Sequence, residues 1–137
     1  MYVSAPVNAF YRPQVSVAPR EASIEIDLSP EFHHPLGAAH GSIYFKMLDD
    51  AAFFAAASLE REVFLLTASF TIHLFRPVSE GVLRAEGRVL HEGRTQYGAA
   101  SELFDAQGRR IAAGSGVFLR SRTRLADLEA YRSSAGG

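Results

Sequence analysis

Cysteine is absent from this chain of 137 residues. Its absence excludes disulfide frameworks, cysteine nucleophiles and zinc–thiolate sites together. If the protein is an enzyme without a cofactor, carboxylates and histidines are therefore its natural reactive groups. A chain of this length forms one domain and can bury a core without covalent staples.

The chain also lacks an excess of charge of either sign. It carries 14 basic and 15 acidic residues, for a formal net charge of -1. Nucleic-acid-binding domains usually carry a marked basic excess, so we expect no nucleic-acid partner. The basic residues are all arginines except Lys46. Arginine suits bidentate phosphate contacts, although a solvated arginine surface is the better explanation for most of them.

No apolar run is long enough to cross a bilayer. The most apolar stretch, 43–59, is interrupted by Lys46, Asp49 and Asp50. The first eight residues do not show the basic start and apolar run of a secretory signal. We therefore expect a cytoplasmic protein with no membrane contact.

Hydrophobic periodicity predicts one helix and five strands. Apolar and polar residues alternate in the predicted strands, and alanine and phenylalanine dominate the predicted helix. We predict strands at 21–28, 63–76, 82–91, 95–104 and 109–119, and the helix at 42–58. Residues 1–20 are expected to form an N-terminal arm with one helical turn near 7–11, residues 21–121 the domain, and 122–137 a tail with a helix at 125–131.

The order of these elements favours an α+β fold, in which a long central helix is wrapped by a curled antiparallel sheet of five or six strands. The four strands after the helix have short connections and suggest a meander. Small residues would let the helix lie on the sheet, namely Ala85, Gly87, Ala99 and Ala113. An open sheet leaves unpaired edges, and pairing with a second copy of the chain covers them.

Two adjacent carboxylates lie in the middle of the apolar helix. A carboxylate there is costly unless it is paired or functional. Lys46 stands four residues before Asp50 and can pair with it. Lys46 can also reach Asp49, but one lysine does not readily serve two buried acids. Asp49 is therefore the stronger candidate for a functional role.

Three histidines gather near the start of the helix, namely His33, His34 and His40. Their spacing does not match a helical metal-binding pair, so we expect no metal. His40-Gly41-Ser42 opens the helix, where backbone N–H groups point outward at the positive end of the helix dipole. Such groups can stabilise negative charge that develops on a carbonyl oxygen.

These same residues resemble a known signature. The run 34–42 (HPLGAAHGS), followed by MLDDA at 47–51, is similar to the hotdog-fold acyl-CoA thioesterases of the PaaI type. That family has Asn-x-x-Gly-x-x-His-Gly-Gly and then Leu-Asp-Ala on the central helix. TASFTIHLFRP at 67–77 resembles the family's strand that ends in an Arg-Pro turn. The resemblance covers about residues 21–119 and implies a hotdog fold.

The resemblance implies a role for each matching residue. Asp49 takes the position of the catalytic carboxylate, as general base on water or as nucleophile toward the thioester. The N–H of Gly41 would be the oxyanion donor, His40 would orient the loop, and Thr67 would help to place the water.

Two positions depart from the family pattern. His34 stands in place of the family's asparagine, and its role is left open because histidine can also donate to a carbonyl or position water. Ser42 replaces the second glycine, where it could narrow the acyl channel or supply an N-terminal cap.

In that family the site lies between two subunits, so the resemblance implies a homodimer, or a tetramer, with no metal and with coenzyme A only as part of the substrate. The phosphates of coenzyme A would require arginines, and the candidates are Arg76, Arg88, Arg94, Arg120 and Arg122. Aromatic residues that could line an acyl pocket are Tyr44, Phe45, Phe53 and Phe54, with core packing expected for at least two of them.

Two other functions fit the same residues. A hotdog hydratase or dehydratase would use His34 and Asp49 to move protons on a β-hydroxyacyl chain. A non-catalytic domain would bind acyl-CoA without turning it over. The sequence pattern matches the thioesterases better than either alternative.

Overall fold

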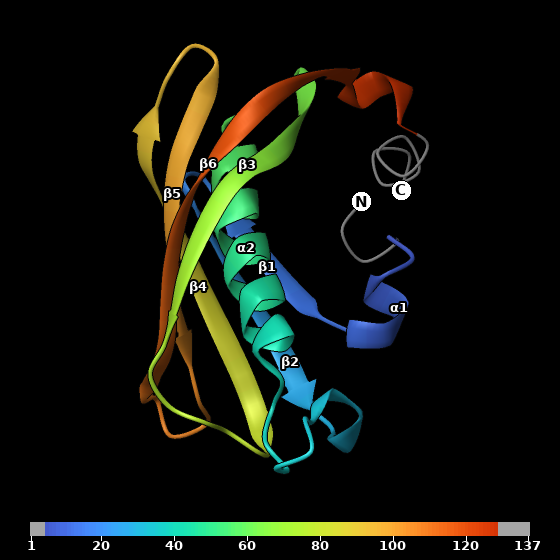
Figure 1. The fold of residues 1–137 in the computed structure, drawn as a ribbon. Helices are drawn as coiled ribbons and strands as arrows, with labels where there is room; N and C mark the ends of the chain where they lie inside the picture. The colour runs from blue at the N-terminus through green and yellow to red at the C-terminus, as the bar shows by residue number, and fades with distance from the viewer. Residues whose placement is uncertain (1–4, 129–137) are drawn as a thin grey trace.

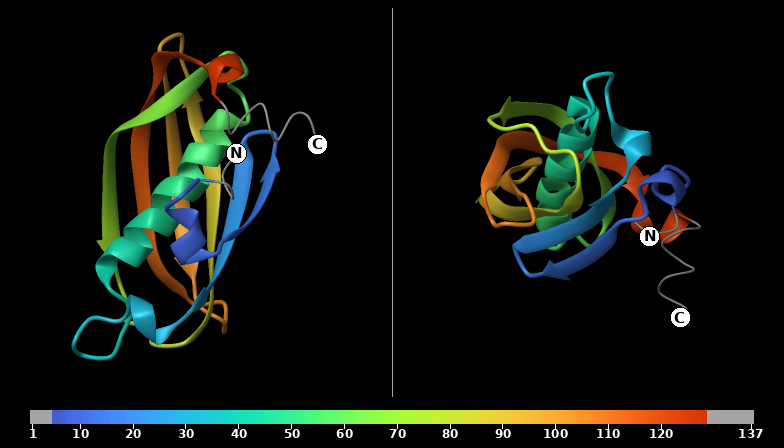
Figure 2. Two further views of the ribbon diagram at one scale, coloured as in Figure 1. Left: turned by 90° about the vertical axis from the view of Figure 1, so that its right-hand side faces the viewer. Right: turned by 90° about the horizontal axis from the view of Figure 1, so that it is seen from below.

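The computed structural model describes residues 5–128. A curled six-stranded antiparallel sheet wraps around the long helix α2, Gly41–Ala57, but does not close around it (Figure 1, and the view from below in Figure 2). The strands are β1 Gln14–Ala18, β2 Glu21–Leu28, β3 Val63–Leu74, β4 Gly81–Glu92, β5 Gln96–Phe104 and β6 Arg110–Arg124. The short helical turns are α1 Asn8–Tyr11, η1 Pro30–Phe32 and η2 Leu125–Asp127.

The strand order is β1-β2-β4-β5-β6-β3, and every neighbouring pair is antiparallel. This arrangement confirms the predicted α+β hotdog architecture, with six strands. The predicted positions of α2 and of the five strands are also confirmed, apart from shifts of a few residues at their ends.

The predicted four-strand meander is wrong at its first member. Strand β3 does not pair with β4; it pairs with β6 and forms an edge of the sheet. The connection 75–80 passes the start of α2, where the N–H of Ala39 donates to the carbonyl of Val78 at 2.8 Å. Alternation of apolar residues shows which face of a strand is buried, but it contains no information about which strand lies beside it.

The N-terminal arm contributes a strand that the sequence did not predict. Strand β1 pairs antiparallel with β2, from Gln14 opposite Glu25 to Ala18 opposite Glu21. Its side chains are almost all exposed, so it has little of the apolar alternation that marks a half-buried strand. The predicted helical turn near residues 7–11 is confirmed by α1.

Strand β6 is longer than predicted, and the described part of the predicted helix at 125–131 is a short 3₁₀ turn that ends before Leu128. The strand runs to Arg124, beyond the predicted end at Leu119. The three residues of η2 follow, and Leu128 is already extended. Residues 129–131 lie outside the described part of the chain.

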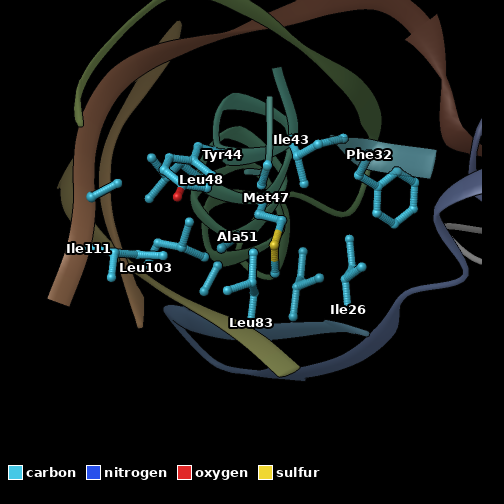
Figure 3. Close-up of a cluster of buried hydrophobic side chains, with 14 residues drawn as sticks. Ile26, Phe32, Ile43, Tyr44, Met47, Leu48, Ala51, Leu83, Leu103 and Ile111 are labelled. Atoms are coloured by element: carbon cyan, nitrogen blue, oxygen red, sulfur yellow. The ribbon is translucent and has the colours of Figure 1, made fainter. Parts of the chain in front are cut away.

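The core lies between α2 and the concave face of the sheet (Figure 3). Met47, Leu48 and Ala51 of the helix pack against strand residues such as Leu83 and Leu103, and all five are fully buried. Within residues 5–128, no helix has the length and apolar character needed to span a membrane.

The helix approaches β4 so closely that one position requires glycine. A Cβ atom on Gly87 would lie 2.1 Å from the carbonyl oxygen of Ala51. Ala85 and Ala99 are fully buried beside this contact, as predicted. On β6, however, Ala112 is the buried residue and Ala113 is only half-buried, because the predicted inward face there was shifted by one residue.

A buried carboxylate fixes the segment between α2 and β3. Glu60 accepts hydrogen bonds from the N–H of Glu62 and the hydroxyl of Tyr97, both at 3.0 Å, and pairs with the guanidinium of Arg120 at 2.8 Å. Burial acts to raise the pKa of Glu60, but these donors together outweigh it and lower that pKa. Burial and the carboxylate raise the pKa of Tyr97 to about 12. These contacts anchor the segment that precedes β3 to Tyr97 of β5 and Arg120 of β6.

Candidate active site

The start of α2 is capped by a histidine. His40 is extended (φ -65°, ψ 144°), and its Nδ1 accepts a hydrogen bond from the N–H of Ser42 at 3.1 Å. The hydroxyl oxygen of Ser42 lies 2.8 Å from the same nitrogen. The N-cap is therefore His40, and the capping role considered for Ser42 is wrong. This cap fixes the orientation of the first turn of the helix.

The loop before the helix is folded back on itself. The N–H of Gly37 donates to the carbonyl of His34 at 2.9 Å, and Gly37 has a φ of +82°, which favours glycine. The Nδ1 of His34 accepts from the N–H of Leu36 at 3.1 Å. His33 turns elsewhere, with its Nε2 2.7 Å from the carbonyl oxygen of Ser79. Among residues 5–128, no three histidine or acidic residues are placed to share a metal ion.

A hollow of about 290 Å³ opens beside the first turn of α2. We call it the Gly41 hollow, and it brings together His34, Gly41 and Arg76 of the predicted site. The remaining lining residues are Ala39, Tyr44, Leu74, Phe75 and Pro77. The hollow thus combines the positive end of a helix dipole with one arginine and one histidine, a combination suited to negative charge.

Two turns farther along the helix, Asp49 lies half-buried and accepts a hydrogen bond from the hydroxyl of Thr67 at 3.0 Å. The structure therefore brings these two predicted site residues together. Burial raises the pKa of the Asp49 carboxyl, and the charge of Asp50 adds to the rise. The Thr67 hydroxyl and the Lys46 ammonium act in the opposite direction without cancelling it. A raised pKa suits a carboxylate that must accept a proton.

Asp50, the adjacent acid, is in a different environment. Its carboxylate pairs with Lys46 at 2.5 Å, and the side chains of the two residues are only 16% and 15% exposed. The predicted pairing is confirmed. Asp50 is thus bound by a cation, whereas Asp49 is held by a neutral hydroxyl.

Asp49 opens onto a second hollow, of about 310 Å³. It lies between α2, the first half of β3 and the residues around the start of α1, and we call it the Asp49 hollow. The polar members of its lining are Lys46, Asp49, Asp50, Asn8 and Thr67, and the apolar members are Ala5, Val7, Phe53, Phe54, Phe64, Leu65 and Leu66.

The four aromatic residues that could line an acyl pocket lie in different surroundings. Phe53 and Phe54 line the Asp49 hollow, with ring centroids 5.0 Å apart. Tyr44 is buried in the core, where its hydroxyl donates to the carbonyl of Arg76 at 3.0 Å and its ring borders the Gly41 hollow. Phe45 packs edge-on against Phe70 of β3.

Within one chain the two hollows are separate. Gly41 and Asp49 are eight positions apart on one straight helix, which places them roughly 12 Å apart along its axis. Strand β3 runs past both hollows. Thr67 touches Asp49 near one end of the strand, and at the other end a Cβ atom on Gly41 would lie 3.4 Å from Cδ1 of Leu74.

Among the candidate arginines, only Arg76 lines either hollow. Arg88 lies on the outer face of β4, where it pairs with Glu102 at 3.5 Å. Arg94 is exposed in the turn after β4. Arg120 is bound to Glu60, and Arg122 is exposed near the end of β6. Arg76 lies in the connection before β4 and Arg94 in the turn after it, so the 12 residues of that strand separate them along the chain.

The residues of the arm that line the Asp49 hollow were not predicted from the sequence. Ala5, Val7 and Asn8 border the Asp49 hollow, and Tyr11 stacks over the Lys46 ammonium at 5.1 Å. Small residues in a proline-rich arm have no periodicity that would mark them as lining. The adjacent aromatic pair at 10–11 is the one signal that the arm docks on the domain.

Comparisons with known proteins agree with this architecture. The model of the thioesterase superfamily matches residues 36–112, more than half of the chain. A curated relative from Saccharolobus solfataricus, named "Putative esterase SSO1253", is 26% identical over 83 residues. The match covers 61% of this chain and 55% of that protein, so it spans about half of the relative's length.

Solved structures extend the comparison to the whole fold. The PaaI protein from the phenylacetic acid degradation operon of Escherichia coli superposes with a TM-score of 0.83 at 20% identity, covering 90% of each chain. Thioesterase HI1161 of Haemophilus influenzae gives a TM-score of 0.78 at 12% identity, covering 86% of this chain and 84% of that one. At these identities the likeness establishes the fold alone. Together with the family match, it shows that this chain is a hotdog-fold protein that belongs to the thioesterase superfamily.

Proposed function

We propose that this protein is an acyl-CoA thioesterase that works as a homodimer, with each active site built from the Asp49 hollow of one subunit and the Gly41 hollow of the other. One observation carries the proposal: the two hollows lie at opposite ends of one sheet edge, β3. Antiparallel pairing of that edge with a second copy joins each hollow to its complement.

The exposed side chains near β3 support such pairing. Leu66, Leu74 and Phe75 are large apolar residues that are 51–53% exposed in the single chain. An exposed apolar edge strand is a liability that a second strand removes, because pairing satisfies its backbone groups and covers its side chains. A two-fold axis makes such a contact self-complementary.

The register of this pairing follows from the site. A two-fold axis midway between Phe70 and Thr71 sets Thr67 of one strand opposite Leu74 of the partner subunit. Since Thr67 contacts Asp49 and Leu74 borders Gly41, the axis brings Asp49 toward Gly41 of the partner subunit. A dimer then has two complete sites, and a monomer has only separate halves.

Hydrolysis follows from the groups that meet in this arrangement. The thioester carbonyl lies at the first turn of the partner's helix, and Asp49 faces the carbonyl carbon. As general base, Asp49 takes a proton from water while the water oxygen bonds to that carbon. The N–H of Gly41 of the partner subunit donates to the oxyanion. The C–S bond then breaks, the thiolate of coenzyme A leaves and takes up a proton, and the free acid remains.

The same geometry suits a nucleophilic Asp49. In that route a carboxylate oxygen of Asp49 displaces the thiolate and forms an anhydride, which water then opens. A single turnover in ¹⁸O-labelled water separates the two routes. The general-base route places the label directly in the product acid, whereas the nucleophilic route with attack on the aspartyl carbonyl places it first in Asp49.

The coenzyme A moiety of the bound substrate would extend out of the site past the Gly41 hollow. Arg76 lines that hollow and would bind one of the phosphates of coenzyme A. The guanidinium offers forked donors to phosphate oxygens. Arg88 is less suited to this role because it faces the other side of the sheet and is paired with Glu102.

The direct test is release of free thiol from a panel of acyl-CoA esters, with wild-type protein and the Asp49→Asn variant. We expect wild-type turnover and a loss of about 10²–10⁴-fold in kcat for the variant, the usual contribution of a positioned base or nucleophile. Asp27→Asn, at an exposed position on β2, is the matched control and keeps full activity.

Other outcomes would overturn the proposal in different ways. Unchanged hydrolysis by Asp49→Asn would refute the assigned mechanism. Hydration of enoyl-CoA without thiol release would indicate the hydratase that uses His34 and Asp49. Binding of acyl-CoA with no turnover of either kind would indicate a non-catalytic acyl-CoA-binding domain.

A further inference from the structure

We infer that residues 5–11 form a wall that limits how far an acyl chain can extend beyond Asp49, so that this N-terminal segment determines substrate chain length. The inference rests on the proposed thioesterase function and deepens it. The segment lies outside the residues that match the family, 36–112.

The first support is the shape of the Asp49 hollow. One side is α2, with Asp49 and the rings of Phe53 and Phe54; a second side is the first half of β3. The third side is the arm, through Ala5 and Val7. In Figure 1 α1 lies on the side of α2 that the sheet leaves uncovered, and the rotated view in Figure 2 places it in front of the same part of the helix.

The second support is the distribution of polarity in the hollow. Its carboxylates lie on one turn of α2, whereas Phe53, Phe64 and Leu65 make the surface beyond them apolar. A thioester with its carbonyl at Asp49 would lay its acyl chain over that apolar surface, toward the arm. The volume of about 310 Å³ is at the lower end of the range for ligand pockets. The space beyond Asp49 therefore suits a short acyl group.

The third support is the way in which the wall is anchored. The ring of Tyr11 stacks on Phe32 at 5.6 Å, and Phe10 meets Phe32 edge-on at 5.1 Å. Phe32 itself is buried in the core. The second contact of this segment is with α2, where the ammonium of Lys46 lies over the Tyr11 ring, 5.1 Å from its centre. An end fixed to both η1 and α2 keeps the segment in place beside Asp49.

The residues that face the hollow from the arm are small. Ala5 and Val7 leave space that a larger side chain would fill, and Val7 is 53% exposed, so the fold does not depend on its packing. Val7 is therefore the position at which pocket length can be changed without disturbing the core. Val17 on β1 is 48% exposed and does not line the hollow, which makes it a matched control.

The experiment measures kcat/KM for straight-chain acyl-CoA esters of increasing length. In the wild type, kcat/KM should rise about fourfold for each methylene that is buried, equivalent to about 0.8 kcal/mol, and then stop rising at a limiting length. Val7→Ala should move that limit to longer chains and Val7→Phe to shorter ones. Val17→Ala should leave the profile unchanged. Identical profiles for wild type and both Val7 variants would overturn the inference.

A binding measurement separates this inference from the proposed function. Non-hydrolysable thioether analogues of the same lengths are titrated calorimetrically into each Val7 variant in the Asp49→Asn background. A length limit in affinity that moves with Val7 supports the wall even if no ester is hydrolysed. Ester hydrolysis with an affinity profile that ignores Val7 supports the thioesterase and refutes the wall.

Discussion

The Asp49 hollow and the Gly41 hollow have nearly the same volume, about 310 and 290 Å³, but opposite chemistry. The first offers a carboxylate with a raised pKa against an apolar surface. The second offers the first turn of a helix, a histidine and an arginine. One is suited to accepting a proton and the other to stabilising negative charge. In the proposed mechanism each hollow is therefore half of a site, and neither completes the reaction alone.

Apart from Asp49→Asn, the largest expected effect comes from removing the donor in the Gly41 hollow. Gly41→Pro deletes the backbone N–H at the first helical position, where proline is tolerated. His40 already has the extended conformation that a residue before proline adopts. We expect kcat to fall about 10²–10³-fold.

Gly41→Ala is the control for this variant, because it keeps the N–H and its Cβ would make an ordinary contact of 3.4 Å with Leu74. A thiol-release assay and a thermal melt follow both variants. Equal loss of activity in the two would contradict the role assigned to the N–H.

Mixing the two inactive variants tests directly whether the hollows belong to different subunits. A heterodimer of Asp49→Asn and Gly41→Pro chains contains one site with both groups intact and one with neither. After co-refolding of equal amounts, we expect recovery of about a quarter of wild-type activity. Recovery is measured by thiol release against each variant alone, and a mixture no more active than its components would refute the shared site.

The next prediction compares how the two adjacent acids of α2 affect the stability of the fold. Asp50→Asn removes the carboxylate from a largely buried ion pair with Lys46, so we expect the free energy of unfolding to fall by about 2 kcal/mol. Asp49→Asn removes an acid whose raised pKa shows that burial disfavours its charged form. Its stability at neutral pH should therefore be equal to that of the wild type or higher. Chemical denaturation of both variants makes the comparison, and a larger loss for Asp49→Asn would reverse the assigned roles.

The smallest effect concerns Thr67, whose hydroxyl lowers the pKa of Asp49 against the larger effect of burial. Activity requires the ionised carboxylate, so it is present above this pKa and is lost as the pH falls through it. Thr67→Val removes the lowering contribution and should move the acid limb of the kcat/KM profile to higher pH. At neutral pH we expect a loss of about tenfold, the value of one hydrogen bond to a carboxylate.

The control for the pH profile is Thr123→Val, at an exposed position on β6. It should reproduce the wild-type profile. An acid limb that does not move, or that moves to lower pH, in Thr67→Val would show that the hydroxyl does not act on Asp49.

Much of the fold could be predicted from local patterns. The alternation on β2 and β4 and the apolar surface of α2 depend on side-chain period, which the sequence displays directly. Strand β1 escaped prediction because it is an exposed edge, and β3 was assigned the wrong neighbour because strand order depends on contacts distant in sequence. The 15 residues of β6 were underestimated because its second half is mostly exposed.

The candidate site, like the fold, could be predicted from the sequence only in part. The pairing of Lys46 with Asp50 follows from helical spacing and was predictable, and the choice of Asp49 as the stronger functional candidate followed from it. Thr67 was named only through the family resemblance, as a residue that would help to place the water, and its contact with Asp49 is known from the structure. No local pattern indicated that Val7 borders the same hollow, whereas the alternation on β4 already placed Arg88 on the face opposite to that of Gly87.

The sequence by itself determined the lengths and faces of most elements, the pairing of Lys46 with Asp50 and the histidine–glycine start of the helix, because these depend on residues a few positions apart. Only the tertiary structure decided that β3 lies at an edge, that the arm reaches Asp49, and that Asp49 and Gly41 open onto separate hollows. Those features depend on how the sheet curls around α2. That curl is set by packing between residues far apart in the chain, such as Gly87 against Ala51, which no local pattern records.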